Sequence, residues 1–206
     1  MTEAEWLACT EPEAMLEFLR GKASDRKLRL FSVACCRKIW DTLTDERLRR
    51  AVEVGEQYAD GLVSDQTRSA AWDAVLNMKI DAVERQDWER AVRIRRTQGP
   101  VLDFMSKSAR YISDVDWGLQ CRLLRDILGN PFRPASIDPT VLTWNCATVP
   151  RMAQAISDDR AFDRLPILAD ALEEAGCSEP AILSHCRSGS EHVRGCWVID
   201  LLLGRE

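Results

Sequence analysis

The sequence lacks the short motifs that identify common reactions. It contains no glycine-rich phosphate loop, no H-E-x-x-H metalloprotease motif and no G-x-S-x-G nucleophile motif. The C-x2-C knuckle, by which most structural zinc sites are recognised, is also missing. These absences leave no residue that could be assigned a catalytic role, so we expect a protein that is not an enzyme.

Long apolar runs are missing as well. No stretch of about eighteen apolar residues is available to span a bilayer. The opening residues, MTEAEWLACTEPE, lack the basic start and apolar centre of a secretory signal. The sequence therefore predicts a cytoplasmic protein that has no role at a membrane.

The chain has no excess of positive charge, since its formal net charge is -5 and its pI is about 5.3. Such a protein repels phosphate backbones unless it carries a local basic patch. The densest candidate patch consists of Arg90, Arg93, Arg95 and Arg96. Carboxylates interleaved with these arginines dilute the charge, so we interpret the patch as a solvated helix surface and do not expect nucleic-acid binding.

Sustained alternation of apolar and polar residues is absent, whereas apolar residues recur at helical spacing along most of the chain. With 206 residues, of which 46% are hydrophobic and 30% charged, the chain can bury a sizeable core. We predict an all-α fold, an irregular bundle of about nine to eleven helices. The C-terminal half is expected to form a small stack of short paired helices, the last of them over residues 191–203.

The most irregular stretch is GNPFRPASIDP, residues 129–139, which holds three prolines and one glycine. It is the best candidate for a boundary between two helical subdomains, 1–128 and 129–206. Phe132 in its middle also fits an ordered loop, because linkers seldom carry an aromatic residue. One continuous domain therefore stays open as the alternative.

Eight cysteines occur in the chain, and most of them lie within apolar helical patterns. A short secreted chain with this number would suggest disulfides, but this chain is long and carries no export signal. We therefore expect reduced cysteines in the core.

The C-terminal stretch, Cys177 to Glu206, holds both histidines and three cysteines. On a continuous helix His192 and Cys196 would be neighbours four residues apart, a spacing at which an imidazole and a thiolate can chelate zinc. The remaining ligands would come from His185, Cys186 or Cys177. The preferred interpretation is nevertheless that the cysteines are buried and the histidines partly exposed without any metal, and the zinc site is the alternative.

Asp200 lies in WVIDLLL, which is apolar on nearly every side of a helix. A carboxylate in such a place is costly unless it is paired or accepts hydrogen bonds. We therefore expect Asp200 to be a buried structural residue with a specific partner. It would continue the stripe of His192 and Cys196 along the last helix.

Three parts of the chain carry distinctive segments: the opening MTEAEWLACTEPEAMLEFLRGKASDRKLRLF, the central LLRDILGNPFRP, and the closing RLPILADALEEAGC, HCR and HVRGCWVIDLLLG. Together they resemble an uncharacterised family of bacterial proteins in which these segments recur in many paralogues, sometimes beside other modules. The resemblance implies no activity, cofactor or catalytic residue. A module that occurs in many combinations is typical of an adaptor or interaction domain.

These observations favour a non-catalytic helical module that binds another protein. The alternative function is that of a small zinc-binding helical protein that uses the C-terminal histidines and cysteines. No cofactor is expected under the first hypothesis, and zinc is expected under the second.

Overall fold

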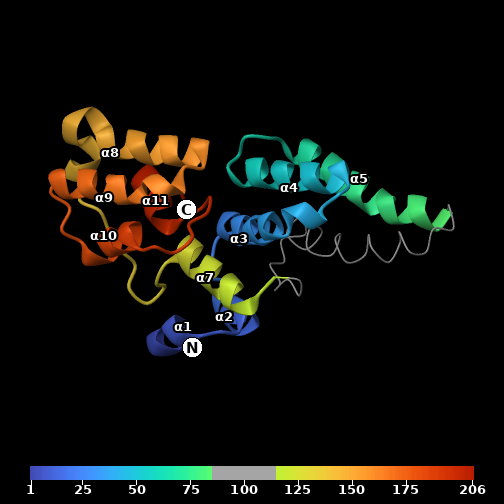
Figure 1. Cartoon of the computed structure of the whole chain (residues 1–206), viewed down its shortest axis with the longest axis horizontal. Helices are drawn as coiled ribbons and strands as arrows, with labels where there is room; N and C mark the ends of the chain where they lie inside the picture. Colours follow the sequence, from blue (N-terminus) through green and yellow to red (C-terminus); the bar gives the residue numbers. More distant parts are fainter. Residues whose placement is uncertain (85–114) are drawn as a thin grey trace. The chain divides into compact units, whose positions relative to one another are not determined.

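The computed structural model describes residues 1–84 and 115–206, and the side chains of residues 1–77 and 115–206. These residues form ten α-helices and two short 3-10 turns, and no strand occurs among them (Figure 1). The predicted all-α fold is therefore confirmed. None of the described helices combines the length and the apolar composition needed to cross a bilayer. The predicted basic patch, Arg90, Arg93, Arg95 and Arg96, lies outside the described residues.

The chain forms two compact units. Unit 2 comprises residues 9–121, and unit 1 comprises residues 1–8 together with residues 122–206. The helices of unit 2 are α2 (Pro12–Leu19), α3 (Asp25–Lys38), α4 (Glu46–Ala59) and α5 (Asp65–Glu84). Those of unit 1 are α1 (Glu3–Ala8), α8 (Pro139–Asp159), α9 (Leu165–Glu174), α10 (Pro180–Arg187) and α11 (Trp197–Leu203). Helix α7 (Trp117–Leu128) begins in unit 2 and ends in unit 1.

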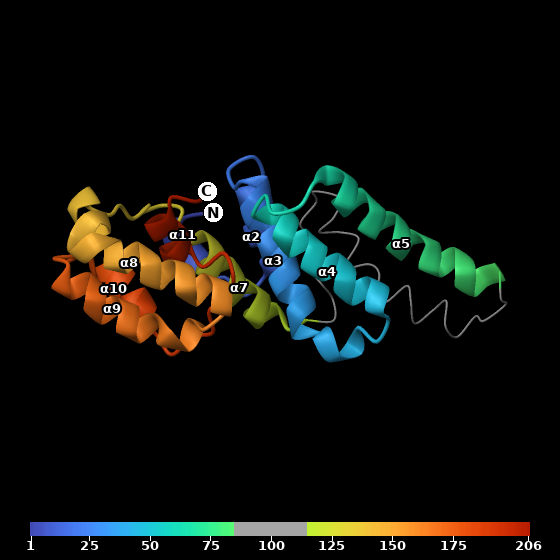
Figure 2. The same ribbon diagram turned by 90° about the horizontal axis from the view of Figure 1, so that it is seen from above.

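In unit 2, α4 packs against both α3 and α5 (Figure 2). Helix α3 begins where the Ser24 hydroxyl accepts a hydrogen bond from the amide of Lys27. The buried side of α3 includes Leu30, Phe31 and Cys35, which are at most 1% exposed. Because each short helix buries its apolar side against a neighbour, tertiary packing rather than helix propensity stabilises this unit.

In unit 1, α9 packs against α8 and α10, and α11 packs against α8 and α10 (Figures 1 and 2). These helices share one apolar core, to which Val149, Leu168, Ile182 and Val198 contribute fully buried side chains. This arrangement is the expected stack of short helices. It fixes the ends of α10 and α11, which hold the site described below.

The N-terminal helix α1 belongs to unit 1 because two hydrogen bonds tie it to the end of α7. The Trp6 indole N–H donates to the carbonyl oxygen of Gly129 over 3.2 Å, and the Arg125 guanidinium donates to the Trp6 carbonyl oxygen over 2.8 Å. Residues 129–138 form an irregular segment, as predicted. The compact units thus differ from the expected division into 1–128 and 129–206 at residues 1–8 and 122–128.

The last helix is shorter than predicted. Helix α11 starts only at Trp197, whereas the sequence pattern suggested a helix over residues 191–203. Gly195 has φ 92°, a left-handed conformation that ends any helix running through it. The prediction was therefore wrong for residues 191–196, and His192 lies in a loop rather than one helical turn before Cys196.

Candidate metal centre

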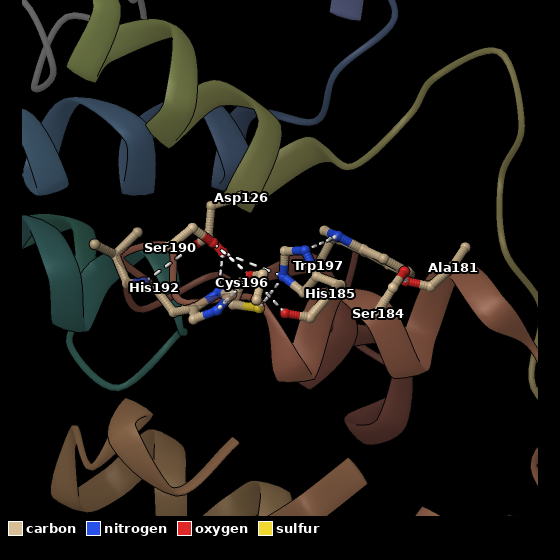
Figure 3. Close-up of polar contacts among 10 residues, drawn as sticks. Asp126, Ala181, Ser184, His185, Ser190, His192, Cys196 and Trp197 are labelled. Carbon is tan, nitrogen blue, oxygen red and sulfur yellow. Dashed lines mark hydrogen bonds and ion pairs between the residues drawn. The ribbon is translucent and has the colours of Figure 1, made fainter. Parts of the chain in front are cut away.

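Four side chains from three segments of unit 1 converge in one place (Figure 3). Asp126 comes from the last turn of α7 and His185 from the last turn of α10. His192 and Cys196 both come from the loop between α10 and α11, and Cys196 immediately precedes the first residue of α11. One donor atom from each residue lies within 4.8 Å of all the others.

The shortest contacts of the cluster centre on one carboxylate oxygen. Oδ1 of Asp126 lies 2.6 Å from Nδ1 of His192 and 3.2 Å from Nε2 of His185. The same Nε2 atom lies 3.1 Å from Sγ of Cys196. Ligand atoms around a tetrahedral zinc ion are about 3.3–3.7 Å apart, given Zn–N and Zn–O bonds near 2.0 Å and a Zn–S bond near 2.3 Å. The three contacts are shorter than this spacing and the outer limit of 4.8 Å is longer, so the side chains would have to shift to surround an ion.

Asp126 holds the loop in place, since its second oxygen, Oδ2, accepts the backbone N–H of Val193 over 2.9 Å. The residue is 4% exposed. Burial alone raises the pKa of the Asp126 carboxyl group, but the hydrogen bonds from His185 and His192 outweigh it, so the pKa lies below its usual value. Asp126 is thus a buried carboxylate whose negative charge is retained through contacts with two imidazoles.

Cys196 is fully buried. Burial and the neighbouring charge of Asp126 raise the pKa of its thiol well above the usual range, although the backbone amides of Ile199 and Val198 act in the opposite direction. Without a cation beside it, Cys196 is therefore a neutral thiol. It has none of the thiolate character that a cysteine nucleophile requires.

The two imidazoles have different surroundings. Nδ1 of His185 accepts the indole N–H of Trp197 over 3.1 Å. Nε2 of His192 lies 3.3 Å from the hydroxyl of Ser188, which can donate or accept. The break at residues 188–190, which the sequence predicted, places Ser188 here, because α10 ends at Arg187.

Three of the five residues predicted as zinc ligands come together, namely His185, His192 and Cys196. They meet through the folding of the loop and not through the predicted helical spacing. Cys177 and Cys186 lie in the apolar core of unit 1 instead. Burial raises the pKa of the Cys186 thiol to about 12, and the neighbouring Cys177 side chain acts in the same direction.

Asp200 is 2% exposed and lies on the buried side of α11. Its backbone N–H donates to the carbonyl oxygen of Cys196 over 3.0 Å, one helical turn before it. It is not one of the residues that converge on the candidate centre.

Sequence reasoning missed Asp126. The signal was the same as for Asp200, because Asp126 lies in LLRDIL, where Leu123, Leu124 and Ile127 are buried. A carboxylate in an apolar helical segment calls for a partner. The partner could not be identified, because His192 is 66 residues further along the chain.

Cys196 is not placed to act as the nucleophile of a Cys-His-Asp triad. In a Cys-His-Asp triad the thiol and the carboxylate contact opposite nitrogens of one imidazole. Here Cys196 and Asp126 both contact Nε2 of His185. Donor atoms that converge on one point from several directions are instead what a bound cation requires.

All eight cysteines lie in the described part of the chain and are free thiols, six of them buried.

No protein-family model matches the chain, and neither the curated proteins nor the solved structures contain a significant match.

Proposed function

We propose that this chain is a metal-binding protein in which Asp126, His185, His192 and Cys196 hold a zinc ion. The observation that carries the proposal is the convergence of four donor atoms within 4.8 Å of one another, brought together from α7, α10 and the loop at residues 188–196. Burying titratable side chains is costly unless each is paired. A buried group of this composition therefore differs from a chance cluster of polar residues on a protein surface.

The donor chemistry favours zinc over the common hard cations. Magnesium and calcium prefer sites made of oxygen atoms alone. One thiolate, two imidazole nitrogens and one carboxylate oxygen form a mixed set of the kind that suits Zn²⁺ and its spectroscopic substitute Co²⁺. To bind the ion, Cys196 must release its thiol proton to solvent, and the positive charge of the metal supplies the stabilisation that the buried thiolate lacks.

A structural role fits this site better than a catalytic one. The side chains of His192 and Asp126 are each 4% exposed, that of His185 is 16% exposed, and Cys196 is fully buried. Four protein ligands in such surroundings leave no open position for a substrate or a reactive water molecule. The ion would link α7, α10, the following loop and the start of α11.

The test is metal analysis of protein purified without chelator, followed by titration of the metal-free protein with Zn²⁺ and Co²⁺. We expect one ion per chain, and the Co²⁺ form should show the absorption of a tetrahedral site with a thiolate ligand. Cys196→Ala should abolish the thiolate absorption and weaken Zn²⁺ binding by at least about 100-fold.

Cys186→Ala is the matched control, because Cys186 is equally buried and lies on the same helix as His185 but outside the cluster. It should bind Zn²⁺ as the wild type does. A wild-type chain that takes up no stoichiometric metal would contradict the proposal, and so would unchanged binding by Cys196→Ala. The adaptor hypothesis drawn from the sequence stays a prediction alongside it.

A further inference from the structure

Two contacts decide which nitrogen of His185 carries the proton in this structure. An indole N–H is only a donor, so Nδ1 of His185, 3.1 Å from Trp197, presents a lone pair to it. Nε2 faces the Asp126 carboxylate, which is only an acceptor, and the thiol of Cys196. Both contacts place the ring proton on Nε2.

That tautomer cannot bind a metal through Nε2. A ligating nitrogen needs its lone pair, so the proton of His185 would have to move to Nδ1. Histidine ligands usually donate this second N–H to a carboxylate, a carbonyl group or water. In this protein it would meet the indole N–H of Trp197, a second donor.

His192 meets no such obstacle. Its Nδ1 atom faces Asp126, while its Nε2 atom lies beside the Ser188 hydroxyl. The Ser188 hydroxyl donates its proton to the carbonyl oxygen of His185 over 2.8 Å and so offers lone pairs to an N–H at Nε2. The proton of His192 can therefore move to Nε2 and leave Nδ1 free for a metal. The two histidines of the centre thus differ in the group beside the nitrogen that would carry the proton in the metal-bound form. This group is an indole N–H for His185 and a hydroxyl for His192.

Trp197 has little freedom to move away from His185 on one side. The indole ring packs against the backbone of Gly129, where a Cβ atom would lie only 3.1 Å from Cγ of the ring. The Gly129 carbonyl group is itself fixed by the indole of Trp6. Packing against Gly129 therefore restricts the Trp197 ring and helps to keep its hydrogen bond to His185.

We infer that Trp197 is a positioning residue that keeps His185 in the tautomer unable to bind metal, and that His185 becomes a ligand only when this hydrogen bond breaks. The inference about metal loading rests on the proposed function, whereas the assignment of the tautomer does not. Asp126, His192 and Cys196 would bind the ion first, and His185 would complete the site.

The tautomer is measured on the metal-free protein by NMR, from the long-range couplings between the ring nitrogens and carbon-bound protons of His185. We expect the proton on Nε2 in the wild type, and a larger fraction of the Nδ1 tautomer in Trp197→Phe, where the Asp126 carboxylate alone still favours a proton on Nε2. A proton on Nδ1 in the wild type, or an unchanged tautomer in Trp197→Phe, would overturn the inference. This measurement decides the matter even if the protein binds no zinc, a result that would refute only the proposed function.

The affinity for Zn²⁺ gives the second test. Trp197→Phe should bind zinc about tenfold more tightly than the wild type, the factor that corresponds to one neutral hydrogen bond lost on loading. The gain should vanish in a His185→Ala background, and Trp144→Phe should show none. Equal or weaker binding by a folded Trp197→Phe variant, or a gain that persists without His185, would overturn the inference.

Loss of the indole could also loosen the fold, so a third measurement uses the wild type. Addition of Zn²⁺ should shift the indole N–H resonance of Trp197, assigned by its absence in Trp197→Phe, and speed its exchange with solvent. An indole resonance that stays in place and protected while zinc binds would overturn the inference.

Discussion

The two units of the molecule neutralise buried carboxylates in different ways. In unit 2, Asp60 accepts hydrogen bonds from the Arg26 guanidinium at 2.8 and 3.1 Å, and Glu56 accepts one from Arg37 at 3.1 Å. In unit 1, Asp126 faces the two imidazoles and the thiol of the candidate centre. All three carboxylate side chains are at most 6% exposed.

The two kinds of partner differ in whether they can give up a proton and offer a lone pair to a metal. A guanidinium keeps its proton throughout the pH range of proteins and has no lone pair for a metal. The arginine partners in unit 2 therefore cannot become metal ligands. Imidazole and thiol groups can give up a proton and offer a lone pair, so a cation can replace the protons around Asp126. A buried carboxylate among nitrogen and sulfur donors can therefore share a metal ion with its neighbours, as proposed for Asp126, whereas one paired with arginine cannot.

The largest difference between the two units is expected when their buried carboxylates are removed. Asp126→Ala leaves two imidazoles and the amide of Val193 without their acceptor, and should lower the free energy of unfolding by about 3–5 kcal/mol. It should also abolish tight zinc binding. Urea denaturation and zinc titration measure the two effects.

Asp60→Ala is the counterpart in unit 2, because it removes the acceptor of Arg26. It should destabilise the protein but leave the affinity for zinc unchanged in the folded state. Equal loss of zinc binding in both variants would remove the distinction drawn here.

Two glycines with similar backbones offer a finer comparison. Gly129 in unit 1 has φ 66° and Gly61 in unit 2 has φ 70°, so alanine at either site pays the cost of a left-handed conformation, about 1–2 kcal/mol. At Gly61 a Cβ atom meets nothing within 4 Å, whereas at Gly129 it lies 3.1 Å from the Trp197 ring.

Gly129→Ala should therefore cost about 1–3 kcal/mol more than Gly61→Ala, because the ring must shift to make room. It should also disturb the tautomer of His185. Thermal unfolding and NMR of the two variants check this expectation, and equal costs would mean that the packing against Trp197 is loose.

Acid should affect the metal-free centre through Asp126. The pKa of this group is lower in the folded than in the unfolded protein, where it is near 3.8. Its stabilising contribution is thus present above that value and is lost as the pH falls through the folded pKa. Below about pH 4 the wild type should lose stability more steeply than Asp126→Asn, by up to about 1.4 kcal/mol per pH unit.

Urea denaturation in the presence of a chelator, from neutral pH into the acid range, measures both slopes. Asp60→Asn provides the matched variant in unit 2. Parallel acid slopes in the wild type and Asp126→Asn would show that Asp126 gains no stability from its imidazole partners.

The smallest effect is expected at the surface of unit 1. Arg187 pairs with Asp170 and Glu173, all three side chains being at least 41% exposed. Solvent screens such pairs, so Arg187→Ala should barely change the stability. Arg26→Ala in unit 2, where the guanidinium side chain is 15% exposed, should cost about 1–3 kcal/mol by the same assay.

Part of the site could be predicted from the sequence. The break at Ser188-Gly189-Ser190 ends α10 as expected, and three of the five residues named for the alternative zinc site, His185, His192 and Cys196, lie together. His192 and Cys196 were predicted to be neighbours on one helix. They do lie together, but Gly195 interrupts the helix between them, so the predicted reason was wrong. Gly195 was a visible signal, since glycine readily adopts positive φ.

The sequence by itself determined the helical class, the irregular segment 129–138 and the donor types available near the C-terminus, because periodicity and turn residues act over a few positions. Only the tertiary structure brought Asp126 to His192 and set the Trp197 indole against His185. These contacts join segments that no local pattern connects, and they depend on how α7, α10 and α11 each meet the loop at residues 188–196. Whether a nitrogen faces a donor or an acceptor is decided by that packing, as the contact between Trp197 and His185 shows.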